Sequence, residues 1–247
     1  MFQAFVAAAS LATALGHAHL SLPHSRTQVA YMNGQDYCPH CALEDVPAPP
    51  GTGGRPYPGS RPFAEPGKAT LTMGPCGKGG GNDYNSPARS WGNIVESYQA
   101  GQVISFESCW NADHKGAYSM RVCPDAALVS KFITPGVTPS SSEMTQLEQC
   151  FQSNVLPCTG VNGNRGCDAL AIASGCQAGW GCASNTDWFY SPNAGAFRDG
   201  SCSTGFYTKD QVQLPAGFTS NHTLLSWRWD ALDTSQLYTG CVDVSIR

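Results

Sequence analysis

The sequence predicts an all-β protein, an immunoglobulin- or fibronectin III-like β-sandwich with long disulfide-tied loops. Three observations support this class. Several short segments alternate apolar and polar residues, as half-buried strands do. Glycine and proline are frequent between them, with 27 and 17 of the 247 residues. The 12 cysteines are an even number, which suits a framework of disulfides. Short strands joined by long glycine- and proline-rich loops are typical of a sandwich.

Four segments carry the strand pattern and one carries a helical pattern. The predicted strands are residues 102–109 (QVISFESC), 117–123 (AYSMRVC), 222–230 (HTLLSWRWD) and 241–247 (CVDVSIR). Residues 141–151 (SSEMTQLEQCF) predict a helix. Residues 44–90 and the cysteine-rich residues 150–206 show neither period, so we expect long loops there. No linker or internal repeat divides the chain, which indicates one domain.

The first 16 residues predict a cleaved signal peptide. The stretch from Phe2 to Gly16 is uncharged, too short to span a bilayer as a helix, and followed by no stop-transfer segment. Ala14 and Gly16 are the small residues that suit cleavage after Gly16, whereas Gly16 and Ala18 suit cleavage after Ala18. We therefore expect a secreted, extracellular domain at 17–247, in a compartment where disulfides persist.

Composition and missing motifs exclude several functions. The net charge of -4, without basic runs, argues against nucleic acid and against a polybasic membrane contact. The motifs of zinc proteases, serine hydrolases and P-loops are absent. Cys38-x-x-Cys41, with His40 between, has the spacing of half a zinc site, but no second pair follows and a disulfide is the preferred interpretation. Asn221, in Asn-His-Thr, is a predicted glycosylation site.

Three of the six histidines lie next to the predicted cleavage site: His17, His19 and His24. Cleavage after Gly16 would make His17 the N-terminal residue, which offers its α-amine and its ring Nδ1 to one metal ion. A further imidazole would complete three nitrogen ligands in a plane, the tetragonal arrangement that Cu(II) prefers. The alternative is that His17 and His19 are exposed residues without a ligand role.

Residues 17–26 (HAHLSLPHSR) resemble the mature N-terminus of copper-dependent lytic polysaccharide monooxygenases of the chitin-binding type-4 kind, including those of auxiliary activity family 15. Members of this family begin with His and place Pro-x-Ser-Arg at their seventh to tenth residues. Pro23, Ser25 and Arg26 fall at these places only when His17 is the first residue. The resemblance therefore implies that His17 is a copper ligand.

A second segment, residues 111–125 (NADHKGAYSMRVCPD), resembles the family's Ala-x-His-x-Gly sequence running into a strand that ends in Arg-x-Cys-Pro. The resemblance implies that His114 is the second imidazole ligand of copper. It also implies that Ala112 is the small residue that crowds one axial face of the ion.

The last segment, residues 235–247 (SQLYTGCVDVSIR), resembles the family's final strand. This implies that Tyr238 lies at the other axial side of copper. Gln236-x-Tyr238 also resembles the Gln-x-Tyr pattern of fungal cellulose-active relatives, in which the amide faces the oxygen site. Both residues are therefore predicted to take part in catalysis.

The resemblance covers the whole domain and implies one copper ion per chain, with an external reductant and O2 or H2O2 as co-substrates. The expected reaction abstracts hydrogen from C1 or C4 beside a β-1,4 glycosidic bond of chitin or cellulose. The partner is an insoluble polysaccharide surface, contacted by a monomer through loop aromatics such as Tyr31, Tyr37, Trp91 and Trp180. Two alternatives are a non-catalytic copper or carbohydrate-binding protein on the same fold and a disulfide-rich structural or effector protein without metal.

Overall fold

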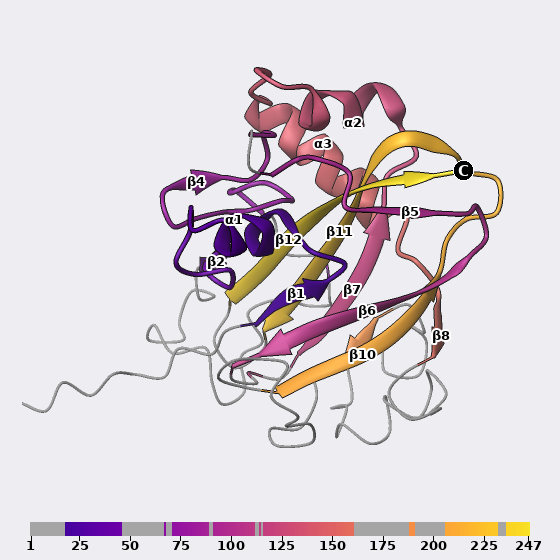
Figure 1. The fold of residues 1–247 in the computed structure, drawn as a ribbon, viewed down its shortest axis with the longest axis horizontal. Helices are drawn as coiled ribbons and strands as arrows, with labels where there is room; N and C mark the ends of the chain where they lie inside the picture. The colour runs from indigo at the N-terminus through magenta and orange to yellow at the C-terminus, as the bar shows by residue number, and fades with distance from the viewer. Residues whose placement is uncertain are drawn as a thin grey trace, which may run out of the picture.

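The computed structural model describes residues 18–45, 67, 71–88, 91–111, 114, 116–160, 188–190, 206–231 and 236–247 (Figure 1). Two β-sheets form a sandwich, which confirms the predicted fold class. One sheet has the strand order β1 (Ala18–Leu22), β6 (Val103–Trp110), β10 (Phe206–Gln213) and β8 (Cys158–Gly160). The other has the order β2 (Leu43–Asp45), β12 (Gln236–Ile246), β11 (Ser220–Ala231), β7 (Ala117–Val122) and β9 (Phe189–Tyr190).

Smaller elements complete these two layers. Strand β5 (Glu96–Tyr98) pairs in parallel with the end of β12, and β3 (Lys78–Gly79) pairs with β4 (Asn82–Asp83). The helices are α1 (Arg26–Met32), α2 (Ala126–Ile133) and α3 (Ser141–Gln152). Helices α2 and α3 contact β11 and β7 respectively, on the side of that sheet away from the main core.

Alternation along β11 explains why this strand is buried on both faces. Leu225, Trp227 and Trp229 belong to the core between the two sheets. Leu224, of opposite parity, belongs to a second core with Phe132 of α2 and residues of α3. Because side chains of a strand point alternately to the two faces, one strand supplies both cores.

The four predicted strands and the predicted helix are present, but β12 begins at Gln236, five residues before the predicted start. Strand β10 was not predicted because two of its inward positions are polar. Thr208 and Asp210 are buried and accept hydrogen bonds from Trp110 Nε1 and the Tyr118 hydroxyl respectively. Buried polar groups paired in this way remove the apolar alternation that identifies a strand.

Helices α1 and α2 were also missed, although both begin at a regular N-cap. The side chains of Ser25 and Asp125 accept hydrogen bonds from the backbone N–H groups of Gln28 and Leu128. Helix α3 has a full capping box between Ser140 and Glu143.

Arg26, the residue directly after the N-cap Ser25, anchors helix α1 to the second sheet. Its guanidinium donates to both carboxylate oxygens of Asp243 on β12, at 2.6 and 2.7 Å, and to the backbone oxygens of Tyr84 and Phe132. Both Arg26 and Asp243 are buried. This bidentate pair fixes α1, and with it the end of β1, against the second sheet.

A second buried ion network ties α3 to the same sheet. Glu148 of α3 accepts from Arg121 of β7 at 2.6 Å and from Arg228 of β11 at 2.7 Å. Arg228 also donates to Asp230 at 2.6 Å. Burial opposes the ionisation of Glu148, but the two arginine charges outweigh it and hold the pKa of this carboxyl below its usual value.

All the cysteines in the described ranges are disulfide-bonded, as the even count predicted. Three bridges are complete within those ranges: Cys38–Cys41, Cys76–Cys241 and Cys123–Cys150. The second joins β12 to the loop before β3, and the third joins α3 to the end of β7. Among the described residues, no helix is both long and apolar enough to cross a membrane.

Candidate metal centre

Two of the predicted site residues, His17 and Ala112, lie outside the described residues, as does the predicted signal peptide. His114, Gln236 and Tyr238 are described. Two neighbouring strands of one sheet lie next to the predicted ligands in sequence: β1 begins one residue after His17, and β6 ends four residues before His114. Ala18, the first residue of β1, pairs with Trp110, the last residue of β6, and β6 leads directly to His114.

Trp229 brings His114 and Tyr238 to one place, although 124 positions separate them in sequence. The imidazole of His114 stacks on the Trp229 indole with 6.2 Å between ring centroids and 9° between planes. The Tyr238 ring stacks on the same indole at 4.7 Å and 27°. Trp229 and Tyr238 are cross-strand partners on β11 and β12. Sequence reasoning had not assigned Trp229 to the site.

Trp110 connects this aromatic cluster to the beginning of the described chain. Its ring meets Trp229 edge to face, with 4.8 Å between centroids, and its Cα pairs with that of Ala18. Both tryptophans are fully buried. The cluster is therefore a rigid part of the core, placed where β1 begins.

Tyr238 and Gln236 form a hydrogen-bonded chain that ends on Asp45. The Tyr238 hydroxyl donates to Gln236 Oε1 at 2.8 Å, and Gln236 Nε2 donates to Asp45 Oδ1 at 3.0 Å. Tyr238 and Gln236 are buried, while Asp45 is exposed on the edge strand β2. Asp45 was another residue without a sequence signal, because it reaches the site only through the β2–β12 pairing.

The Tyr238 phenol is neutral at physiological pH. Burial raises its pKa well above the ordinary value for tyrosine, and the charge of Asp45 raises it further. A neutral phenol is a weak oxygen donor. It would therefore hold a metal ion less tightly than an imidazole does.

His19, two residues after the predicted N-terminal ligand, is also neutral. Burial and the neighbouring His40 lower the pKa of His19 to about 3, although the side chain of Gln28 opposes the shift. The rings of His19 and His40 lie 6.2 Å apart, and His40 Nδ1 lies 3.3 Å from the amide nitrogen of Asn111. A neutral His19 adds no positive charge beside the predicted ligands.

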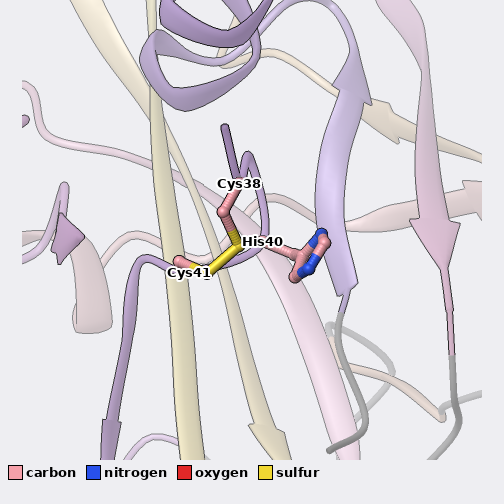
Figure 2. A group of neighbouring side chains, drawn as sticks. All are labelled: Cys38, His40 and Cys41. Atoms are coloured by element: carbon pink, nitrogen blue, oxygen red, sulfur yellow. A yellow bond between two sulfur atoms is a disulfide. The ribbon is translucent and has the colours of Figure 1, made fainter. Parts of the chain in front are cut away.

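The alternative zinc site at Cys38, His40 and Cys41 is wrong. The ligand atoms of these residues lie within 4.8 Å of one another. Figure 2 shows, however, that the two sulfur atoms are joined in a disulfide and that the His40 ring points away from it. Zinc needs free thiolates, which a disulfide does not offer.

The described donors fit copper better than a hard cation. They are one imidazole, whose Nε2 is buried, and one neutral phenol held on the same indole. Imidazole is a preferred ligand of copper, whereas magnesium and calcium take carboxylate and carbonyl oxygens. Asp45, the carboxylate of this cluster, accepts its hydrogen bond from Gln236.

Comparison with known proteins identifies relatives over nearly the whole chain. Residues 17–244 match the family described as "Lytic polysaccharide mono-oxygenase, cellulose-degrading". The "AA13 family lytic polysaccharide monooxygenase A" of Pyricularia oryzae is 34% identical over 93% of this chain, which spans 61% of that relative's length. "Lytic polysaccharide monooxygenase aasB" of Emericella nidulans is also 34% identical, over 99% of this chain and 75% of the relative.

Among solved structures, the AA15 lytic polysaccharide monooxygenase of Thermobia domestica in the Cu(I) state superposes with a TM-score of 0.44 and 18% identity, covering 93% of this chain and 98% of the other. The curated relatives with a family number carry number 13 rather than the expected 15. The family model and the Emericella nidulans relative confirm the resemblance at the level of the whole family. The chain belongs to the lytic polysaccharide mono-oxygenases.

Proposed function

We propose that the protein is a secreted, copper-dependent monooxygenase that cleaves polysaccharide chains oxidatively. One observation carries this proposal: His114 and Tyr238 pack on the same indole, and that indole contacts Trp110, the strand partner of Ala18. A chain that begins at His17 would bring its α-amine and imidazole one residue from Ala18. The match of the family model begins at residue 17, which supports this N-terminus.

The side chains have distinct tasks in this proposal. His17 and His114 would supply three nitrogen ligands, and Trp229 would hold the His114 ring in one orientation. Tyr238 would offer a neutral phenol near the ion, with Gln236 hydrogen-bonded to it, and Ala112 would be the small residue that leaves room at the site. Copper bound there supplies one-electron redox chemistry with O2 or H2O2 when an external reductant is present.

We propose a β-1,4-linked substrate, chitin or cellulose, oxidised at C1 or C4. The printed description of the matching family, "cellulose-degrading", supports this linkage. Two of the curated relatives carry the family number 13, however. A substrate comparison therefore has to include an α-1,4-linked glucan, amylose.

Two of the four aromatic residues suggested for substrate contact are suitably exposed. Tyr37 is 80% exposed and Tyr31 45% exposed. Tyr37 lies next to the Cys38–Cys41 bridge and three residues before His40, whose ring contacts Asn111 and His19. Trp91 is buried against Tyr84, which contradicts its suggested role, and Trp180 lies outside the described residues.

Tyr37→Ala should weaken binding to the insoluble substrate by about 2- to 10-fold, which is the worth of one aromatic contact. Met32→Ala is the matched control, because Met32 is 58% exposed and contributes no aromatic face. A pull-down isotherm with each variant measures the effect. Equal binding by the Tyr37 variant and the unmodified protein would exclude Tyr37 from the substrate surface.

The proposed activity is tested by mass spectrometry of soluble products from chitin, cellulose and amylose. Each is incubated with the copper-loaded chain starting at His17, ascorbate and peroxide. Oxidised oligosaccharides from chitin or cellulose would support the proposal. Oxidised products from amylose alone would show that the substrate is α-1,4-linked instead of β-1,4-linked. Substrate binding without oxidised products would favour the non-catalytic alternative, provided that copper is bound.

We further propose that the protein is monomeric and is glycosylated at Asn221 on secretion. Asn221 is exposed at the beginning of β11, which supports its use as an acceptor. Intact mass before and after glycosidase treatment of the secreted protein tests this assignment.

A further inference from the structure

We propose that Asp45 is a positioning residue for Tyr238. Asp45 fixes the orientation of the Gln236 amide, and the amide then takes the phenol proton, so that Tyr238 presents only oxygen lone pairs to a ligand. All of these hydrogen bonds lie within this chain, and their significance for catalysis rests on the proposed function.

The backbone register places these three residues in line. Asp45 of β2 and Gln236 of β12 are paired across the ladder, and Tyr238 follows Gln236 by two positions. Residues two apart on a strand project from the same face. The observed contacts agree: 3.0 Å from Gln236 Nε2 to Asp45 Oδ1 and 2.8 Å from the Tyr238 hydroxyl to Gln236 Oε1.

The chemistry of the carboxylate decides which way the amide lies. An ionised carboxylate only accepts hydrogen bonds, so Asp45 can face the NH2 end of Gln236 but not its carbonyl oxygen. The carbonyl oxygen is then directed to Tyr238, where it accepts the phenol's single proton. If the amide were reversed, its NH2 group would donate to the phenol oxygen and occupy a lone pair. The phenol proton would need another acceptor.

Asp45 is itself held by the residues around it. The neighbouring Glu44 accepts hydrogen bonds from Thr72 N at 2.7 Å, from Thr72 Oγ1 at 2.6 Å and from Met73 N at 2.9 Å. On the other side, Thr239 N donates to Ala42 O at 3.1 Å. These contacts fix the short edge strand between a loop and β12. Although Asp45 is exposed, its backbone is preorganised toward Gln236.

Three variants separate the effect of the hydrogen-bond acceptor at position 45 from the effect of its charge and from that of removing any surface acid near β12. Asp45→Ala removes the acceptor, whereas Asp45→Asn retains an acceptor oxygen without the charge. Glu96→Gln is the matched control, since Glu96 is an exposed acid on β5, which pairs with the opposite end of β12. Solvent exchange of the Gln236 side-chain amide is measured by NMR in the copper-free, full-length mature chain with 15N-labelled glutamine. Gln236→Glu identifies the signal.

We expect Asp45→Ala to accelerate exchange of the Gln236 amide about tenfold or more, as loss of a hydrogen bond to a charged group implies. Asp45→Asn should give an intermediate rate, because its amide lacks the charge and can also present its NH2 group to Gln236, whereas Glu96→Gln should stay within about threefold of the unmodified protein. Exchange and chemical shift unchanged in Asp45→Ala would overturn the proposal. Because no copper is present, this result is independent of whether the proposed function holds.

The link to Tyr238 is tested in the copper-loaded protein by electron paramagnetic resonance of Cu(II). Asp45→Ala should alter the Cu(II) spectrum in the same sense as Tyr238→Phe, while Glu96→Gln should match the unmodified protein. An altered spectrum in Tyr238→Phe with an unaltered one in Asp45→Ala would overturn the positioning role.

Discussion

Trp229 packs against both His114 and Tyr238, so its substitution distinguishes packing at the site from packing in the core generally. Trp229→Phe should lower copper affinity, because the smaller ring leaves the His114 imidazole free to turn. Trp227→Phe is the matched control. Trp227 is equally buried on β11 but contacts Trp110 and Tyr118 instead.

Both phenylalanine variants should lose comparable stability in denaturant, and only Trp229→Phe should weaken copper binding in calorimetry. Equal copper affinity in the two variants would show that the stacking on Trp229 has no role in ligation.

Tyr238 and Gln236 are expected to affect turnover more than copper affinity. The affinity depends mainly on the three nitrogens, so Tyr238→Phe and Gln236→Ala should change it by no more than about 1 kcal/mol, the worth of one weak contact. Turnover of Gln236→Ala should fall roughly 100-fold, as loss of a preorganised polar group in a catalytic site commonly does. Product formation at the unmodified rate would exclude Gln236 from catalysis.

Sequence alone proposed His114, Gln236 and Tyr238 as candidate site residues, but it did not predict how they meet. Gln236 and Tyr238 are recognisable because their Gln-x-Tyr pattern lies within one strand, and His114 because of its flanking residues. Trp229 and Asp45 depend on strand register, β11 against β12 and β2 against β12, which no local pattern specifies. A residue that acts through a cross-strand neighbour leaves no signal in its own segment.

At the scale of elements, prediction succeeded for the longer segments with one apolar face, and it missed the five-residue strand β1, whose inward Ala18 and Leu20 are apolar. It failed at β10, whose buried Thr208 and Asp210 are hydrogen-bonded, and at the short helices α1 and α2. The Pro-x-Ser-Arg motif was recognised by its resemblance to a family, without a predicted structural role. The structure supplies that role, because Ser25 caps α1 and Arg26 pairs with Asp243.

Helix α3 depends on Glu148, which predicts acid sensitivity. The pKa of Glu148 is lower in the folded chain than in the unfolded chain, so the unfolded chain binds the proton first as pH falls. Its contribution to the free energy of unfolding is complete above about pH 4.3, the ordinary value, and is lost as pH falls through the folded pKa.

Glu148→Gln should lower the free energy of unfolding at pH 7 by about 3–5 kcal/mol, since buried Arg121 loses its carboxylate partner and buried Arg228 loses one of its two. It should also flatten the pH dependence below about pH 4.3. Chemical denaturation across this pH range measures both effects. Glu143→Gln, on the exposed face of the same helix, should cost much less. A comparable loss in the two variants would contradict a special role for the buried network.

At the scale of the molecule, the sandwich brings chain segments near residues 18, 114 and 238 to one end of the core. The two sheets meet there through Trp110 and Trp229, and the disulfide Cys76–Cys241 secures the loop beside β12. Composition and strand pattern predicted the architecture. They did not predict the strand order, because pairing between strands far apart in sequence depends on the assembled core.

The central claim is that the mature N-terminus and His114 together form a copper site, and a calorimetric titration with Cu(II) tests it directly. Three proteins are compared: the chain starting at His17, the same chain with one additional N-terminal residue, and the His114→Ala variant. We predict one tight, sub-micromolar site in the first protein, and affinity lower by more than about 100-fold in the other two, beyond the usual effect of losing an outer hydrogen-bond partner of a ligand. Equally tight binding in all three would contradict the proposed site.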